Sequence, residues 1–249
     1  MAINNGDFVK VNFTGKIKDT GDIFDTTYEE VATEEGFNTS SRKYEPIPII
    51  VGSKHLLPAI EDEIEGLDAG DKKTVEIACE DAFGKRDSSN VQLIPMKEFK
   101  KQGITPVPGM PISFGELTGK VLTVSGGRVR VDFNHELAGK DLIYDVEIVE
   151  IIEDDEDKVK SMIALHNTNP NVNIDNFEID FDGEEVNVHM DELSKFDQKS
   201  LMDVSLERFK IAKDICDNMD YSKVNFIDSF EINNDEEEVE AEVEVEDEE

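Results

Sequence analysis

The sequence predicts an α+β protein: an antiparallel sheet packed on one short helix, interrupted by a small β-rich domain and followed by a second α+β domain. Three observations predict this class. Residues 8–17 and 142–148 alternate apolar and polar side chains, as half-buried strands do. Residues 56–67 place apolar side chains at helical spacing. Between residues 85 and 133 the composition changes, and prolines appear at 95, 106, 108 and 111.

The first block reads as a sheet that encloses the helix. A hairpin is predicted over residues 8–27, because Asp19-Thr20-Gly21-Asp22 has turn composition. A short buried strand follows at 47–50, and then the helix, with Pro58 in its first turn and Gly66 near its end. Another alternating strand runs from residue 72 toward Cys79, which is in phase with Val75 and Ile77. We therefore expect Cys79 to be a small buried residue with an unreactive thiol.

The middle block is long enough to fold by itself, although it is near the lower limit for an independent domain. It contains a short helical piece at 95–103 and a hairpin that turns at Gly126-Gly127. The join at 134–139, between the strands at 128–133 and 142–148, is too long for a tight hairpin turn. We interpret this join as the second crossing between the insert and the parent sheet.

The segments "VNFTGKIKDTGDIFDTT", "VGSKHLLPAIEDEIEGLDAGDKKTVEI", "EDAFG" and "LIYDVEIVEI" resemble, in order, the signature segments of FKBP-type peptidyl-prolyl isomerases. The join "NHELAGKDL" with the insert resembles the SlyD-like branch, in which an insert-in-flap domain interrupts the loop over the active site. The match spans residues 6–152, and the remainder resembles the extra C-terminal domain of long archaeal relatives. The implied organisation is an FKBP-like domain over 1–86 and 135–153, an insert over 87–134, a C-terminal α+β domain over 154–233 and a disordered acidic tail over 234–249.

The resemblance implies an apolar pocket that accelerates rotation about X-Pro bonds without a nucleophile or cofactor. Its catalytic positions fall on these residues: Phe13, Phe24, Asp25, Leu56, Leu57, Ile60, Phe83 and Tyr144. Phe13 and Phe83 stand where many relatives have tyrosine, and Ile60 stands where short relatives have tryptophan. Tyr144 replaces a phenylalanine. Burial in any β-domain would also explain Phe13 and Tyr144, and turn capping would also explain Asp25.

The join and the insert are the expected substrate-binding surfaces. Leu137 and Ala138 are expected over the pocket, and His135 is interpreted as a hydrogen-bonded structural residue because no second ligand stands at metal spacing. The insert has too many apolar side chains for all of them to be buried. Those expected to contact unfolded or nascent polypeptides are Ile94, Met96, Phe99, Ile104, Met110 and Phe114.

The C-terminal block predicts helices at 157–166 and 201–219, a hairpin over 177–190 with an Asp-Gly turn, and a final strand from 223. Residues 178–189 imitate a calcium loop only in part, since His189 stands where a glutamate is required. Phe209, Ala212, Ile215 and Met219 form one predicted apolar stripe. The resemblance implies that this domain forms a homodimer or holds clients.

Charge and composition exclude several function classes. A net charge of −34 repels phosphate backbones and anionic membrane surfaces, so neither nucleic acid nor membrane is an expected partner. Residues 235–249 carry eleven acids and no base, which predicts disorder. The two cysteines, far apart in sequence, predict reduced thiols, and with no apolar run or leader the expected location is cytoplasmic.

The functional hypothesis is therefore a prolyl isomerase and folding chaperone with no metal. Two alternatives from other classes remain open. A binding-only holdase is compatible with the missing tyrosine hydroxyls at positions 13 and 83, and an acidic cation buffer is suggested by charge alone.

Overall fold

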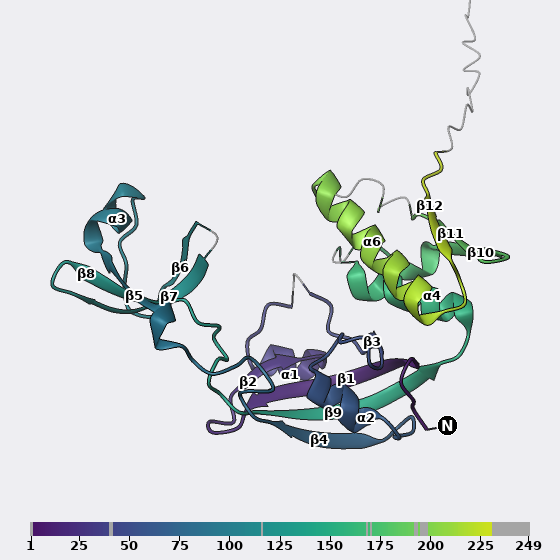
Figure 1. The fold of residues 1–249 in the computed structure, drawn as a ribbon, viewed down its shortest axis with the longest axis horizontal. Helices are drawn as coiled ribbons and strands as arrows, with labels where there is room; N and C mark the ends of the chain where they lie inside the picture. Colours follow the sequence, from purple (N-terminus) through teal and green to yellow (C-terminus); the bar gives the residue numbers. More distant parts are fainter. Residues whose placement is uncertain are drawn as a thin grey trace, which may run out of the picture.

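The computed structural model describes residues 2–39, 42–115, 117–167, 169, 171–191, 194 and 199–230. Within them the chain forms three sheets and three apolar clusters (Figure 1). The predicted α+β class is confirmed. The predicted acidic tail at 234–249 lies outside the described residues. No helix in the described ranges is long and apolar enough to span a bilayer.

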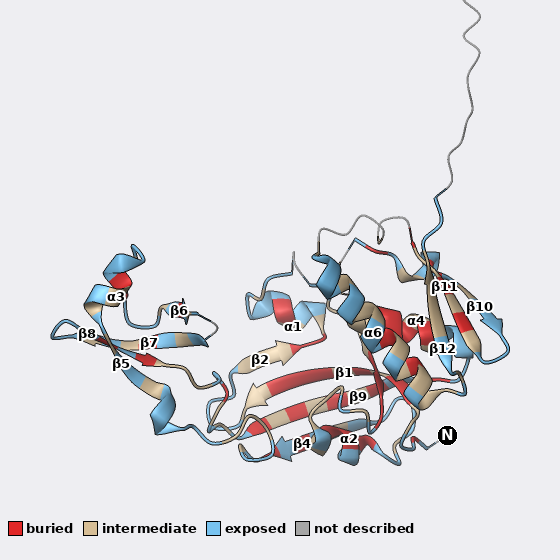
Figure 2. Ribbon diagram, turned by 45° about the horizontal axis from the view of Figure 1, so that its top comes forward, coloured by how far each residue is buried: buried red, intermediate tan, exposed pale blue. Residues whose placement is uncertain are grey.

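The main sheet is antiparallel and has β1 and β9 at its centre. Its order is β2-β1-β9-β4, and β3 pairs with β1 beyond the end of β2. The strands are β1 (Phe8–Ile17), β2 (Ile23–Thr26), β3 (Ile47–Ile50), β4 (Lys72–Ile77) and β9 (Leu142–Ile152). Buried residues concentrate along β1 and β9 in Figure 2. β1 pairs with β9 along its whole length, so these two strands hold the sheet together at its centre.

Two short helices accompany this sheet, α1 (Glu29–Glu34) and α2 (Pro58–Ile64). Pro58 occupies the first turn of α2, where its missing N–H costs no hydrogen bond, and Gly66 follows with φ of 85°. Ile60 and Ile64 of α2 are buried against the sheet. The helix and the residues on its buried face were therefore predicted correctly.

The strand before the insert ends earlier than the alternation suggested. β4 stops at Ile77, and Cys79 lies in the following turn, half-buried, with its Sγ 3.2 Å from Oε2 of Glu80. The prediction of a buried Cys79 was wrong, because the chain leaves the sheet before the alternation ends. Hydrogen bonding to Glu80 raises the pKa of the Cys79 thiol, which keeps it unreactive.

The insert forms a four-stranded sheet with order β5-β8-β7-β6. Its elements are η1 (Ser88–Asn90), β5 (Val91–Pro95), α3 (Met96–Lys101), β6 (Pro111–Phe114), β7 (Leu117–Ser125) and β8 (Arg128–Asp132). Gly126 and Gly127 both have positive φ and close the β7–β8 hairpin, as predicted. Figure 1 shows the insert standing out at one end of the molecule.

The C-terminal part packs two helices on a small sheet. Its elements are α4 (Asp155–His166), η2 (Ile174–Asn176), β10 (Glu178–Asp182), β11 (Glu185–His189), α6 (Leu201–Asn218) and β12 (Lys223–Ile227). The predicted hairpin is β10 and β11, and β12 adds parallel to β11. The part is joined to the main sheet by a shared cluster in which Phe8, Ile50 and Ile152 meet Met162 and Ile163.

The predicted apolar stripe of α6 needs correction at its first member. Ile211 and Ile215 are buried, but Phe209 is 63% exposed. Phe209 instead shares an outward face with Met202 and Leu206, at a spacing of three and four residues. The helix is thus apolar on two faces, and periodicity alone could not decide which one the small sheet occupies.

Candidate functional site

Seven of the eight predicted catalytic side chains gather in one apolar cluster on the main sheet. Phe13, Ile60 and Tyr144 are buried there. Four others are half-buried against the same cluster: Phe24, Leu56, Leu57 and Phe83. They come from β1, β2, β9 and α2, from the loop before α2 and from the loop after β4. The fold therefore brings together positions up to 131 residues apart in the sequence. We call these seven side chains the aromatic site.

The centre of the aromatic site is a three-ring contact. The Tyr144 ring lies 5.7 Å from Phe13 and 5.6 Å from Phe24, with Phe24 edge-on. Gly15 pairs with Tyr144 on one side and with Asp25 on the other, and it leaves the space that the rings occupy. A Cβ at Gly15 would stand 2.6 Å from Cζ of Phe24 and 3.1 Å from Cε1 of Tyr144. The glycine is therefore required by the rings, a role that the sequence reasoning missed although a glycine inside a strand often marks a close approach.

Asp25 lies at the edge of the aromatic site. Its Oδ1 accepts hydrogen bonds from the backbone N–H of Thr26 at 2.9 Å and from Nη1 of Arg42 at 2.8 Å. Arg42 belongs to a segment for which the sequence suggested no role. Burial, with a smaller contribution from the negative charge of Asp25, raises the pKa of Tyr144 to about 12. The Tyr144 hydroxyl therefore stays protonated at neutral pH and remains able to donate a hydrogen bond.

The join after the insert lies against the same cluster. Leu137 is buried within it, and the His135 ring stacks on Phe83 with centroids 4.2 Å apart and planes 4° from parallel. Nδ1 of His135 accepts from the N–H of Leu137 at 3.2 Å, and the N–H of Gly139 donates to the carbonyl of Gly84 at 2.7 Å. His135 is thus a hydrogen-bonded structural residue, as expected. By stacking on Phe83 it packs the join against the main cluster.

Comparison with known proteins decides the family. A short-type peptidyl-prolyl cis-trans isomerase of Methanocaldococcus jannaschii is 37% identical over 149 residues, which is 60% of this chain and 94% of that protein. The chain belongs to the FKBP-type peptidyl-prolyl cis-trans isomerases. Further relatives are a probable FKBP-type 16 kDa isomerase of Pseudomonas fluorescens, 35% identical over 53% of this chain and 81% of its own, and SlyD of Vibrio cholerae, 37% identical over 46% and 58%.

Two family models account for the remaining parts. The FKBP26 IF domain matches residues 92–137 and the FKBP26 C-terminal domain matches residues 155–231. The chain is therefore a SlyD-like FKBP isomerase with an additional C-terminal domain.

The insert of this FKBP isomerase keeps some of its predicted substrate-binding side chains inside. Phe99 is fully buried and contacts Phe114 edge-on, so it belongs to the core of the insert and offers no surface to a client. Ile94, Met96, Ile104, Met110 and Phe114 are half-buried around that core. The fully outward apolar residues are Leu93, Val107 and Leu117, which are 53% to 63% exposed. As expected, the insert cannot bury all its apolar side chains.

The two crossings between sheet and insert are tied together by Asn134. Its Oδ1 accepts from the N–H of Asp87 at 2.8 Å, and its Nδ2 donates to the carbonyl of Asp87 at 2.8 Å and to Oδ1 of Asp132 at 2.6 Å. Arg86 forms an ion pair with Asp132 beside it. We call these residues the neck. The neck holds the insert at a defined position relative to the join that carries Leu137.

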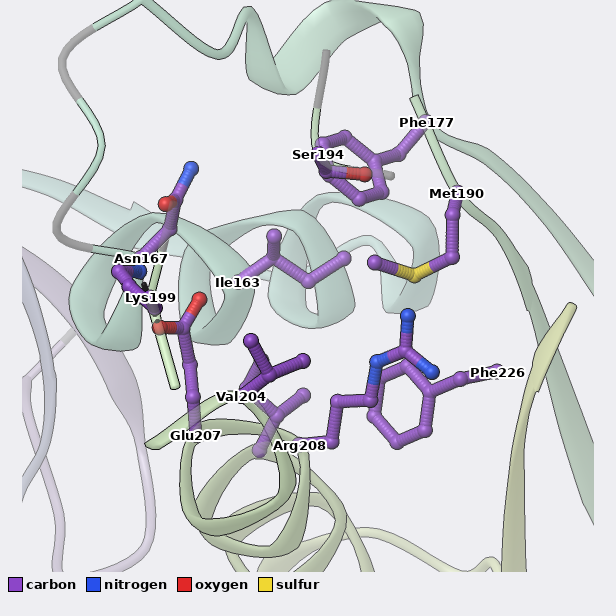
Figure 3. Close-up of a pocket in the computed structure, with 11 residues that line it drawn as sticks. Ile163, Asn167, Phe177, Met190, Ser194, Lys199, Val204, Glu207, Arg208 and Phe226 are labelled. Atoms are coloured by element: carbon purple, nitrogen blue, oxygen red, sulfur yellow. Dashed lines mark hydrogen bonds and ion pairs between the residues drawn. The ribbon is translucent and has the colours of Figure 1, made fainter. Parts of the chain in front are cut away.

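A small cavity lies elsewhere, in the C-terminal part. Figure 3 shows its lining, in which Met190 and Phe226 flank the guanidinium of Arg208. Its volume of about 30 Å³ holds roughly one water molecule. It is too small for a peptide side chain, so it does not compete with the aromatic site for substrate.

Proposed function

We propose that the aromatic site receives the proline of an X-Pro bond and that its dryness accelerates rotation of that bond. The observation that carries this proposal is the packing of Phe13, Phe24 and Tyr144 over a glycine, with Leu137 against the same cluster. Rotation must break amide resonance, with a barrier of about 18–20 kcal/mol. The planar amide is more polar than the twisted one, so an apolar surrounding disfavours the ground state relative to the transition state.

Polar groups are expected only at the edge of the site. The protonated Tyr144 hydroxyl can donate a hydrogen bond to the substrate. Asp25 already accepts hydrogen bonds from Thr26 and Arg42, and it lies at the edge of the site as a structural residue. No covalent step is needed. Phe24→Ala, which admits water beside Tyr144, is expected to reduce kcat/KM for a proline tetrapeptide strongly, whereas Cys79→Ala leaves it unchanged. Thiol reagents that abolish activity without unfolding the protein would contradict this mechanism.

The insert is proposed as the surface that holds unfolded polypeptides beside the aromatic site. The support is the exposure of Leu93, Val107 and Leu117 on a domain whose core is formed by other apolar side chains, buried or half-buried. A client held there has a higher effective concentration at the aromatic site without any additional chemistry.

Replacing residues 87–134 with a short loop tests this proposal. The replacement is expected to preserve most tetrapeptide isomerisation, because none of the seven aromatic-site residues lies in that range. It is expected to slow catalysed refolding of a proline-limited protein and to abolish suppression of aggregation. Equal losses in the peptide and protein assays would mean that the insert only supports the site.

The alternative is a holdase with little isomerase activity. Positions 13 and 83 are phenylalanines, so two hydroxyls that could assist the substrate are absent. The tetrapeptide assay separates the two functions, since a holdase suppresses aggregation without accelerating X-Pro rotation.

A second copy of the chain is proposed as a partner through α6. Met202, Leu206 and Phe209 form an outward apolar face, 50% to 80% exposed, and neighbouring exposed apolar side chains of this kind are typical of an interaction surface. Sedimentation of the intact protein and of Leu206→Glu tests this, with a dimer expected only for the former.

A further inference from the structure

Two histidines that are 111 residues apart share one carboxylate where the C-terminal part meets the isomerase domain. Nε2 of His166, at the end of α4, lies 2.6 Å from Oδ2 of Asp214 on α6. Nε2 of His55, in the loop between β3 and α2, lies 3.2 Å from the same oxygen. All three side chains are 11% to 15% exposed. We call the three residues the clasp.

The hydrogen bonds of His55 define what the clasp is. Nδ1 of His55 accepts from the N–H of Ile50 at 3.0 Å, so the neutral ring carries its proton on Nε2 and donates it to Asp214. Oδ2 of Asp214 thus accepts from both rings. Burial favours the neutral carboxyl group, but the hydrogen bonds from His166 and His55 outweigh burial and hold the pKa of Asp214 below its ordinary value.

A metal ion fits this arrangement poorly, although the three residue types are common ligands and their ligand atoms lie within 4.8 Å of one another. A ligating Nε2 needs a free lone pair, which requires the proton of His55 to move to Nδ1. There it would oppose the N–H of Ile50. The contacts therefore describe a hydrogen-bonded clasp.

The loop that carries His55 also carries two residues of the aromatic site. Residues 51–57, the clasp loop, connect β3 to α2, and Leu56 and Leu57 follow His55 directly. Lys54 in this loop has a φ of 64°, which is unfavourable for a residue other than glycine. Such a conformation persists only where the surroundings hold it.

The loop is held from two sides. From α2, the buried Glu61 accepts hydrogen bonds from the N–H groups of Gly52, Lys54 and Leu56 at 2.8 to 3.1 Å. From α6, Asp214 binds His55, and Oδ1 of Asn218 accepts from the hydroxyl of Ser53 at 3.3 Å. The isomerase domain supplies one set of contacts and the C-terminal part supplies the other.

We propose that Asp214 and His166 are positioning residues for the isomerase reaction, acting through His55 to fix Leu56 and Leu57 at the aromatic site. The proposal rests on the proposed function of that site. It gives the C-terminal part a direct role in peptide turnover, in addition to any role in assembly or client holding.

The test is tetrapeptide isomerisation by the full-length chain, with kcat and KM measured separately. Asp214→Ala is expected to raise KM roughly tenfold with little change in kcat. A factor of ten corresponds to the loss of about one hydrogen bond that holds the clasp loop in place. Asp214→Asn keeps an oxygen that accepts from both rings and is expected to restore KM to within about twofold of the wild type. The matched control is Asp217→Ala on the same helix, whose exposed carboxylate pairs with Lys213 and does not reach the loop.

A double-mutant cycle tests the route through His55. If Asp214 acts through His55, then His55→Ala combined with Asp214→Ala raises KM no more than either change alone. Methyl resonances of Leu56 and Leu57 are expected to shift in Asp214→Ala and not in Asp217→Ala. Measurements well below the unfolding temperatures separate these effects from a simple loss of folded protein.

Three outcomes would overturn the proposal: an unchanged KM in folded Asp214→Ala, an equal rise in KM in Asp217→Ala, or additive effects in the cycle. Stoichiometric binding of Zn²⁺ that is lost in Asp214→Ala, with activity abolished by a chelator, would identify a metal site instead. A wild-type chain without tetrapeptide activity would refute the proposed function itself. Activity in the wild type with no effect of Asp214→Ala would refute the clasp alone.

Discussion

The contact between Gly15 and the two rings gives the sharpest prediction about the aromatic site. In Gly15→Ala the new Cβ would stand 2.6 Å from Cζ and 2.9 Å from Cε2 of Phe24, against an ordinary carbon–carbon separation of about 3.5–4.0 Å. The Phe24 ring must therefore move by about 1 Å. Gly15 does not have positive φ, so alanine fits the backbone and the effect is confined to the rings.

The direction of the movement follows from burial. Tyr144 is 6% exposed and packs on Phe13, so it cannot give way, whereas the half-buried Phe24 can swing outward. Overpacking of this kind costs about 1–3 kcal/mol of unfolding free energy. Misplacement of a substrate-positioning group by about 1 Å reduces kcat/KM by about 100-fold. Most of the loss is therefore expected in turnover, with the protein still folded.

Urea unfolding and tetrapeptide isomerisation measure the two effects. The control is Phe24→Leu, which shortens the side chain that meets the new Cβ. In that background Gly15→Ala is expected to cost little further activity or stability, because the clash is gone. Full activity in folded Gly15→Ala, or an equal loss in both backgrounds, would refute the argument that the glycine exists to seat the rings.

Three further predictions concern ionisation, the neck and assembly. Because the folded pKa of Tyr144 is about 12 and the unfolded value about 10, its contribution to stability is complete below pH 10 and is lost as the pH rises toward 12. Between pH 9 and pH 11 the wild type is expected to lose about 1 kcal/mol more unfolding free energy than Tyr144→Phe, and identical urea midpoints would contradict this. Asn134→Ala loosens the neck and is expected to slow refolding of a protein substrate severalfold while tetrapeptide turnover changes little; equal effects would show that the neck positions the join itself. Phe209→Glu is expected to give a monomer in sedimentation and, at protein concentrations low enough for the wild type to be monomeric as well, an unchanged unfolding free energy, whereas a large loss of stability at those concentrations would place Phe209 in the fold.

Local sequence patterns predicted the strands and the helix whose apolar residues recur at strand or helical spacing, because that spacing alone marks the buried face. The strands β1 and β9, the helix α2 with Pro58 in its first turn, and the hairpin closed by Gly126 and Gly127 lie where alternation, helical spacing and turn chemistry indicated. The order of the signature segments implied that Phe13, Phe24 and Tyr144 lie in one pocket. These features depend on neighbours in sequence or on a family pattern that the residues carry.

Local patterns failed where burial depends on which elements meet. Phe209 and Ile215 both lie on apolar faces of α6, and only packing on the small sheet decides that Ile215 is buried. Cys79 continues the alternation of β4 beyond the point where the strand leaves the sheet. Phe99 is as apolar as the outward residues of the insert, but it forms the core around which they pack.

The sequence by itself indicated the family, because each signature segment is a contiguous pattern, and that resemblance implied the seven side chains that gather in the aromatic site. Only the tertiary structure decided that Gly15 seats two rings, that Arg42 engages Asp25, and that His55 and His166 share Asp214. His55 and His166 are each isolated in sequence, so no spacing rule could connect them. Their meeting depends on how α4 and α6 pack against the loop before α2, a long-range arrangement that no local pattern encodes.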